Sequence, residues 1–214
     1  MKEFTRIQRE IIAGSMLGDG SIEARGPSAR LQIKQAERYG QYVQWLYQYF
    51  QDFCNLAPKP RQDTRQWYFA TRYQSCWLSW HKLFYLNGRK FIPSNIGGFL
   101  TPLSIAVWYM DDGTLDYRVG SHCACSLIVN CFKRSEVELL QYVLREKFGV
   151  ISSIQNPLCR GKRYLRLYVG RDGRETFLKL IKPYIIDCFK YKLPPSNLTP
   201  QRLIRPHLLN VAVR

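Results

Sequence analysis

Three things are scarce in this sequence of 214 residues: acidic side chains, histidine and long apolar runs. No apolar run reaches the roughly 20 residues that a membrane-spanning helix needs. The first residues, Met1 to Arg6, lack the apolar core of a signal peptide. We therefore expect no membrane partner and no cleavable targeting segment.

The acidic residues number 16 against 32 lysines and arginines, which gives a formal net charge of +16. So strong an imbalance favours a polyanionic partner. The alternative is a protein that is basic and soluble without such a partner. Binding to a membrane surface is a weaker interpretation, because the basic residues are spread along the chain rather than gathered on one amphipathic helix.

Cysteine occurs seven times, an odd count without the regular spacing of a secreted disulfide framework. We expect reduced thiols in a protein that works inside a cell or an organelle. His122, Cys123, Cys125 and Cys131 raise the alternative of a zinc site. However, the cysteines alternate with other residues as one face of a strand does, and the tight paired spacings of zinc sites are missing, so buried free thiols are favoured.

The most informative stretch is 103–113, where apolar or small residues lead into two acids and a glycine. Such a run, without internal glycine or proline, predicts a buried helix. Thr101 suits its N-cap, Pro102 its first position and Gly113 its end. The helix delivers Asp112 to its C-terminal end, where the helix dipole is negative. We expect a divalent cation to offset this unfavourable placement.

A weaker copy of this stretch lies at 12–20, where isoleucine, alanine, aspartate and glycine fall in register with 105–113. The offset between Asp19 and Asp112 is 112 − 19 = 93 residues. A second echo, between 90–96 and 192–198, has an offset of 192 − 90 = 102 residues. Because both pairs keep the same order, we expect a duplicated chain with halves at 1–98 and 99–193 and a C-terminal tail at 194–214.

Hydrophobic periodicity predicts the same order of elements in each half, helix–strand–strand–helix–strand–strand–helix. The expected helices span 4–17, 37–53, 76–86, 101–113, 135–149 and 174–181, with paired strands between them. Ser135 and Glu138 have the spacing of a capping box that would start the fifth helix. The fold class is therefore α+β, with the two motif helices packed at the centre and two saddles of antiparallel strands.

Each saddle would carry a polar face, because basic and polar residues alternate with apolar ones along the predicted strands. A β-ribbon can enter the major groove of DNA. The alternative is an ordinary solvated face, which the net charge makes less favourable. The candidate DNA-binding residues are Arg25, Arg30, Gln32, Lys34, Arg61, Arg65, Arg72, Arg118, Lys162, Tyr164, Arg166 and Tyr168.

The stretches 12–20 and 105–113, together with the two Lys-x-x-Pro-Ser-Asn segments, resemble the motifs of the LAGLIDADG homing endonucleases, single-chain organelle-intron type. The resemblance covers nearly the whole chain. It implies that Asp19 and Asp112, at the eighth motif position, are metal ligands. It also implies that Lys90 and Lys192 lie beside the active site, where they position water or stabilise the charge on the phosphorane. The alternative for both lysines is a phosphate clamp without a chemical role.

The predicted activity is metal-dependent hydrolysis of both strands of a specific duplex, with one acid per half. Hard oxygen ligands suit Mg²⁺; we expect Mn²⁺ to substitute and Ca²⁺ to support binding without cleavage. The carbonyls of Gly18 and Asp111 are further candidate ligands. No histidine lies close to either motif, so a histidine general base is not supported.

The expected partner is double-stranded DNA with a long asymmetric site, bound by a monomer inside an organelle. Two alternatives use the same scaffold: an RNA maturase that binds intron RNA, and a nucleic-acid-binding module without catalysis. A basic structural protein of a ribonucleoprotein would not explain duplicated acids in apolar helices.

Overall fold

The computed structural model describes residues 3–61, 63–159 and 161–195. The expected tail from 194 onward, including the second Pro-Ser-Asn echo, lies mostly outside the described residues. The first half runs through α1 (Arg6–Leu17), β1 (Ser21–Arg25), β2 (Ser28–Ala36), α2 (Gly40–Phe50), β3 (Lys59–Arg61), β4 (Gln66–Ala70), α3 (Cys76–Phe84), β5 (Tyr85–Leu86) and β6 (Arg89–Lys90). The second half runs through α4 (Pro102–Asp112), β7 (Gly113–Arg118), β8 (His122–Ile128), α5 (Arg134–Phe148), β9 (Ser153–Gln155), β10 (Leu158–Cys159), β11 (Lys162–Arg163), β12 (Arg166–Val169) and α6 (Arg171–Ile181).

The two halves repeat one topology. Their main sheets have the strand orders β1-β2-β4-β3 and β7-β8-β12-β9, and every paired strand in them is antiparallel. The short pairs β5–β6 and β10–β11 are additions to this pattern. The predicted α+β class and the repeated order of helices and strands are thus confirmed.

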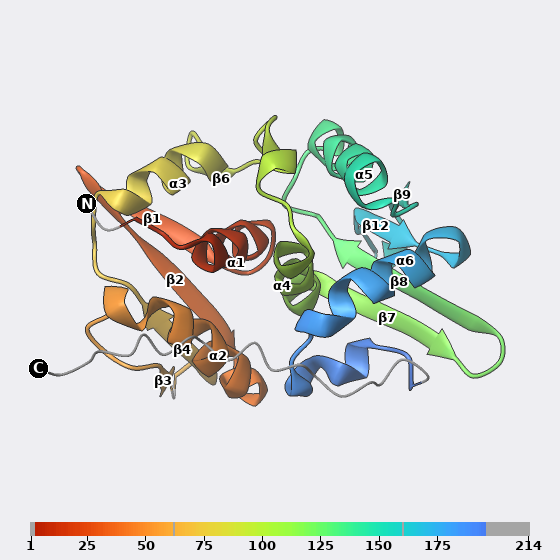
Figure 1. The fold of residues 1–214 in the computed structure, drawn as a ribbon, viewed down its shortest axis with the longest axis horizontal. Coiled ribbons are helices and arrows are strands. Elements are labelled where there is room, and N and C mark those ends of the chain that lie inside the picture. The colour runs from red at the N-terminus through yellow and green to blue at the C-terminus, as the bar shows by residue number, and fades with distance from the viewer. Residues whose placement is uncertain (1–2, 62, 160, 196–214) are drawn as a thin grey trace, which may run out of the picture.

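Helices α1 and α4 pack against each other at the centre of the molecule (Figure 1). Both begin as the sequence predicts. The hydroxyl of Thr5 accepts from the backbone N–H of Gln8, and that of Thr101 accepts from Ser104, the third residue of α4. These bonds satisfy N–H groups that have no partner inside a helix. The first turn of each motif helix is therefore fixed by its threonine cap.

The close approach of the two helices depends on Gly14. A side chain at Gly14 would place its Cβ 2.3 Å from the carbonyl oxygen of Ser104 and 2.7 Å from Cβ of Val107. The second motif has valine where the first has glycine, so a single glycine provides the space at this crossing. The residues from Ile11 to Leu17 in α1 and from Leu103 to Met110 in α4 are buried.

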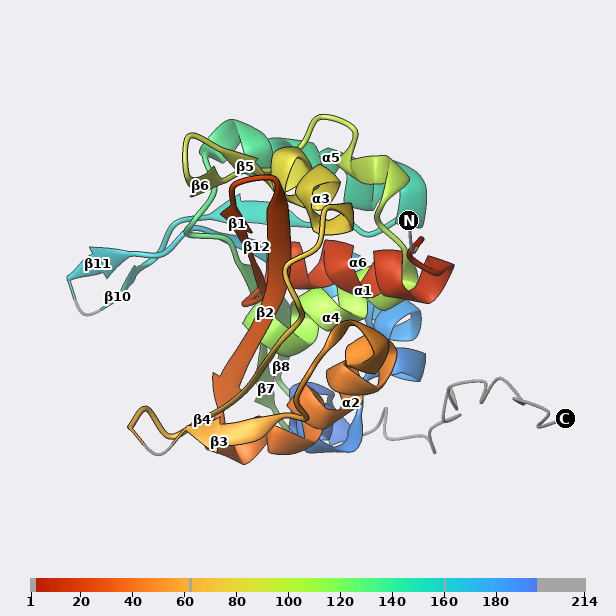
Figure 2. The same ribbon diagram turned by 90° about the vertical axis from the view of Figure 1, so that its left-hand side faces the viewer.

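Both sheets lie on one side of the molecule, with the helices behind them (Figure 2). In β2, Leu31 and Ile33 are buried against the helices, while Lys34 is exposed on the opposite face. The face away from the helices, in both sheets, is called the saddle face below. In Figure 2 the strand pairs β3–β4 and β10–β11 extend toward this side, so they flank the saddle face.

Some details differ from the sequence-based expectations. The fifth helix begins at Arg134, with Lys133 as its N-cap, because Glu136 accepts from the backbone N–H of Lys133. The predicted capping box at Ser135 is therefore wrong, and Glu138 instead pairs with Arg134 at 3.1 Å. In the part of the chain that the structure describes, no helix combines the length and apolar character needed to cross a bilayer.

Candidate active site and nucleic-acid interface

The candidate active site lies where α1 and α4 end. Asp19 follows Gly18, the C-cap of α1, and is exposed, whereas Asp112 is the last residue of α4 and is partly buried. Burial and, after it, the negative charge of Asp19 raise the pKa of Asp112 to about 7. The positive charges of Lys90 and Lys192 act in the opposite direction. The four residues predicted for catalysis are thus close enough to influence one another.

A third acid, Asp111, joins this group through its side chain. Its Oδ2 accepts from the backbone N–H of Asp19 at 3.2 Å. Its Oδ1 accepts from Nε2 of Gln35 at 3.0 Å, and the same nitrogen donates to Oδ2 of Asp19 at 2.9 Å. Burial, followed by the charges of Asp19 and Asp112, raises the pKa of Asp111 well above its usual value.

Gln35 was not among the residues that the sequence singled out. It continues the inward-facing series of Leu31 and Ile33 in β2 and is only 8% exposed. The sequence did contain a signal for it: Gln35 is polar at a position where the alternation of β2 predicts a buried apolar side chain. A buried amide needs hydrogen-bond partners, so such a residue points to a polar site nearby. The structure supplies those partners from both halves of the chain.

The two lysines bind the carbonyl ends of the two motif helices. Lys90 Nζ donates to the carbonyl oxygen of Gly18 at 2.7 Å. Lys192 Nζ donates to the carbonyls of Met110 at 2.6 Å and Tyr109 at 3.2 Å. Cations at helix C-termini offset both the dipole and the unpaired carbonyls. Burial lowers the pKa of Lys90, and it lowers that of Lys192 to about 8.

The oxygen atoms at the two helix ends can form part of the coordination shell of a divalent cation. Within the described ranges, no group of three or more histidine, cysteine, aspartate or glutamate side chains could hold a metal ion by itself. The candidate donors are the carboxylates of Asp19 and Asp112 and the carbonyls of Gly18 and Asp111. Both carbonyls already accept from a lysine, that of Gly18 from Lys90 at 2.7 Å and that of Asp111 from Lys192 at 3.5 Å. Two carboxylates, with water and substrate phosphate completing the shell, match how Mg²⁺ binds to enzymes. The same search leaves the zinc alternative at the cysteines without support.

The strand registers bring most of the candidate DNA-binding residues onto the saddle face. Residues two apart along a strand, and residues directly opposite each other on neighbouring strands, share a face. In the first sheet this rule places together Arg25, Arg30, Gln32, Lys34 and Arg61. In the second sheet it places together Arg118, Arg166 and Tyr168, whereas Lys162 lies in β11 of the separate β10–β11 pair and Tyr164 lies in the segment between β11 and β12.

Each sheet also carries one acid among these basic and polar residues, at equivalent positions. Glu23 accepts from Nε of Arg30 at 2.7 Å and from the amide of Gln32. Asp116, 93 residues later, lies 3.3 Å from Nε2 of His122 and 3.8 Å from Nε of Arg118. Each acid stands three residues after a motif glycine, so the duplication extends to the saddle face.

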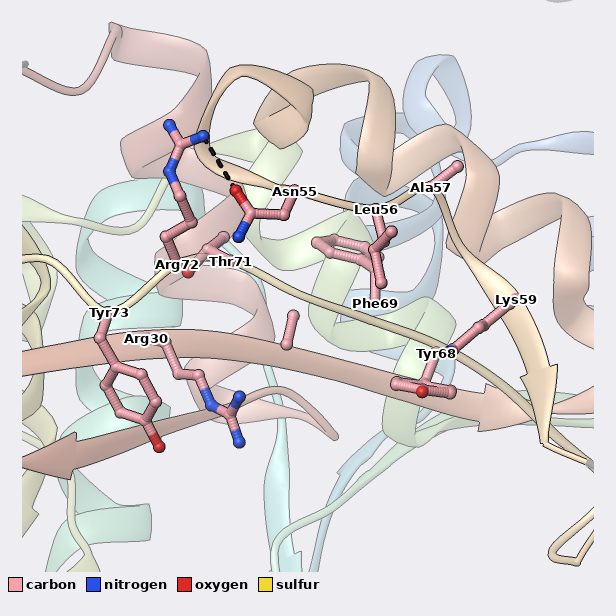
Figure 3. Close-up of a pocket in the computed structure, with 11 residues that line it drawn as sticks. Arg30, Asn55, Leu56, Ala57, Lys59, Tyr68, Phe69, Thr71, Arg72 and Tyr73 are labelled. Carbon is pink, nitrogen blue, oxygen red and sulfur yellow. Dashed lines mark hydrogen bonds between the residues drawn. The ribbon is translucent and has the colours of Figure 1, made fainter.

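Arg72 does not join the saddle face. Its guanidinium donates to the carbonyl of Asp52 at 2.8 Å and to Oδ1 of Asn55 at 3.3 Å. Figure 3 shows this side chain turned away from Arg30 and Tyr73, which lie on the other side of a cavity of about 520 Å³. Arg65 lies in the turn after β3, with a positive φ of 48°, and its carbonyl accepts from the N–H of Glu37.

Paired acid-bearing helices beneath two open, basic sheets define a pseudo-symmetric protein with a strand-built binding face and a central carboxylate site. The chain belongs to the LAGLIDADG DNA endonuclease family, whose model matches residues 9–177. The resemblance inferred from the two motifs is thereby confirmed.

The chain is similar to three proteins in particular. Cytochrome b mRNA maturase bI2 of Debaryomyces hansenii is 31% identical over 197 residues, which cover 86% of this chain and 72% of that protein. The homing endonuclease I-WcaI, solved bound to its DNA recognition sequence, has a TM-score of 0.78 at 25% identity and covers 91% of this chain and 88% of its own. I-DmoI in complex with DNA and Mn shares the fold, with a TM-score of 0.52 at 13% identity over 90% of this chain and 99% of its own.

Proposed function

We propose that this protein is a site-specific endonuclease that cuts both strands of a DNA duplex with divalent metal ions, one acid serving each strand. The observation that carries the proposal is the meeting of Asp19 and Asp112, from the two halves, at the ends of the paired helices. The basic saddle face would hold the duplex on the side from which these helix ends are reached. The I-WcaI and I-DmoI structures, which contain DNA, support this geometry.

Asp19 and Asp112 are the residues that would hold the metal ions, and we propose Mg²⁺ as the physiological ion. Bound there, the ion would polarise the phosphate and lower the pKa of an attacking water. The Mn in the I-DmoI complex supports the use of a divalent ion in this fold. We expect Mn²⁺ to replace Mg²⁺ here, and Ca²⁺ to support binding without cleavage.

The protein side chains around the acids would hold the site in place and stabilise charge. Gln35 orients the carboxylate of Asp19 through the 2.9 Å hydrogen bond to its Oδ2. Lys90 and Lys192 are cations held beside the carboxylates by helix carbonyls, and in the proposed reaction they stabilise the negative charge that develops on the phosphate. The amino-acid sequences of the two saddle faces differ, so the DNA site should be asymmetric, and the duplication makes a monomer sufficient.

The test is cleavage of a randomised duplex library in Mg²⁺, followed by sequencing of the cut ends. Asp19→Asn and Asp112→Asn remove one charge each, and Asp187→Asn, at an exposed acid paired with Lys190, is the matched control. We expect cut ends that share a long motif with the unmutated protein and with the control, and none with the active-site variants. Full cleavage by either active-site variant would refute the role of that acid, and enriched binding without any cutting would refute the nuclease.

A second candidate function is RNA maturation, which the 31% identity to a cytochrome b mRNA maturase favours. That relative also supports an intron origin and an organellar location for this chain. A splicing assay with the intron RNA that encodes the protein separates the two functions. If Asp19→Asn still accelerates splicing, the protein has an activity that is independent of cleavage. If the RNA splices no faster with the unmutated protein than without it, the maturase function is excluded.

A further inference from the structure

The two motif helices end differently, although their sequences are copies. Helix α4 continues through Asp112, so the backbone N–H of Asp112 belongs to the helix. Helix α1 ends at Leu17; the N–H of Gly18 then donates to Gly14, and that of Gly20 donates to Ser15. The N–H of Asp19 lies between these two bonds, beyond the helix.

The backbone N–H of Asp19, which has no acceptor within α1, donates to the side chain of Asp111. Its Oδ2 lies 3.2 Å from the nitrogen of Asp19, and 92 residues separate the two positions in the chain. The contact needs Gly18, because a Cβ there would stand 2.4 Å from the same Oδ2. Gly18 and Asp111 occupy the same position in the two motifs. Since they face each other across the helix pair, only one of them can carry a side chain.

Gln35 extends this one-sided support. Its amide joins Oδ1 of Asp111 to Oδ2 of Asp19, so both the backbone and the side chain of Asp19 are held. Ser21 pairs with Gln32, and its equivalent in the second half, Thr114, pairs with Ser126. Three residues further along each strand, Gln35 therefore has Val129 as its counterpart. Val129 is fully buried and apolar. Asp112 therefore has no amide donor at the equivalent place.

We infer that Asp111 is a positioning residue that acts through Gln35 and the backbone of Asp19, and that it supports the cut made with Asp19 and not the cut made with Asp112. This inference rests on the proposed function. Outer partners of metal-binding side chains commonly contribute about 10- to 100-fold to metal affinity or activity. Loss of the Asp111 carboxyl should therefore slow one strand selectively, and nicked DNA should accumulate.

The test uses Asp111→Ala, which removes the carboxyl but keeps the backbone carbonyl that is a candidate metal ligand. The substrate is a duplex with the selected site and a different label on each strand. We expect cleavage of one strand to fall by about 10- to 100-fold while the other changes little. Gln35→Ala should slow the same strand, and Asp111→Asn, which retains one acceptor oxygen, should lose less. Equal slowing of both strands would overturn the inference.

A second measurement does not depend on cleavage. Amide hydrogen exchange, followed by NMR in EDTA, reports directly on the N–H of Asp19. Exchange at Asp19 should be faster in Asp111→Ala and unchanged in Asp172→Ala, which removes an acid from the start of α6. Unchanged exchange at Asp19 in Asp111→Ala would overturn the inference. If the unmutated protein cuts neither strand, the proposed function fails, and this exchange measurement alone decides whether Asp111 holds Asp19.

Discussion

At the scale of single residues, three acidic side chains lie close together in the site, and two lysines partly offset their negative charge. Asp19, Asp111 and Asp112 meet at helix ends whose dipoles are also negative. The sequence pointed to a metal ion as the compensating charge, but the structure shows that Lys90 and Lys192 already bind the helix carbonyls. The arrangement still leaves the pKa of Asp112 at about 7, so burial and repulsion are only partly offset. Such a site favours function at the expense of stability.

We predict that Asp112→Asn stabilises the metal-free protein at pH 8. The folded-state pKa of about 7 is above the ordinary value near 3.9, so the stabilising contribution of this group is present below about pH 4 and is lost as the pH rises through 7. At pH 8 the ionised Asp112 then costs on the order of 1–4 kcal/mol, which the neutral amide avoids. Thermal unfolding in EDTA should show a higher Tm for Asp112→Asn at pH 8 and a smaller difference at pH 4. A lower Tm than that of Asp187→Asn at pH 8 would contradict the prediction.

At the scale of helices and strands, much of the fold was predictable from local signals. The caps at Thr5 and Thr101, the alternation in β2 and the order of elements are all encoded by residues close together in the sequence. The cross-half contacts were not, because Asp111 meets Gln35 and Asp19 across 76 and 92 residues. The predicted start of α5 at Ser135 was wrong, because Glu136 and not Glu138 accepts from the backbone N–H that precedes the helix.

The crossing of α1 and α4 provides a prediction on stability. Gly14→Ala should destabilise the protein, because the new Cβ would lie 2.3 Å from a backbone oxygen in α4. Overpacking of this kind costs about 1–3 kcal/mol or more, whereas helix propensity alone would favour alanine by about 1 kcal/mol. Urea unfolding measures whether the free energy of unfolding falls, as overpacking predicts, or rises, as helix propensity alone would predict. Gly98→Ala is the matched control, because nothing lies within 4 Å of its Cβ and its stability should change little.

The acid on the first strand of each sheet, Glu23 in β1 and Asp116 in β7, provides a prediction on specificity. An acid facing a polyanion is unfavourable unless it orients donors or accepts from a base. Glu23 binds both Arg30 and Gln32, so Glu23→Gln should change which bases are preferred in one half of the site. Lys34→Ala should weaken binding to all sequences alike, as loss of a phosphate contact does. Binding selection from a library randomised at each position, in Ca²⁺, compares the two; an unchanged base preference in Glu23→Gln would contradict the assignment.

At the scale of the whole molecule, the duplication supplies two similar scaffolds and the side chains make them unequal. Following the strand registers, Lys34 and Gln32 in the first sheet correspond to Ile128 and Ser126 in the second. The first saddle face is therefore the more basic and the second the more apolar along this central strand. Composition gave the total charge but not its distribution, because that depends on which strands pair and in which register.

The net charge of +16 leads to a prediction for DNA binding. Each phosphate that the protein neutralises should contribute about −0.9 to the slope of log affinity against log salt concentration. Lys34, exposed on the saddle face, should account for one such contact, so Lys34→Ala should make the slope shallower by about 0.9. Arg72→Ala is the comparison, because the guanidinium of Arg72 is held by Asn55 and Asp52 away from the saddle face, and it should leave the slope unchanged. Fluorescence anisotropy over a salt series measures all three slopes. Equal slopes for the unmutated protein and Lys34→Ala would remove Lys34 from the phosphate contacts, and a flat dependence for every variant would mean that charge does not drive the binding.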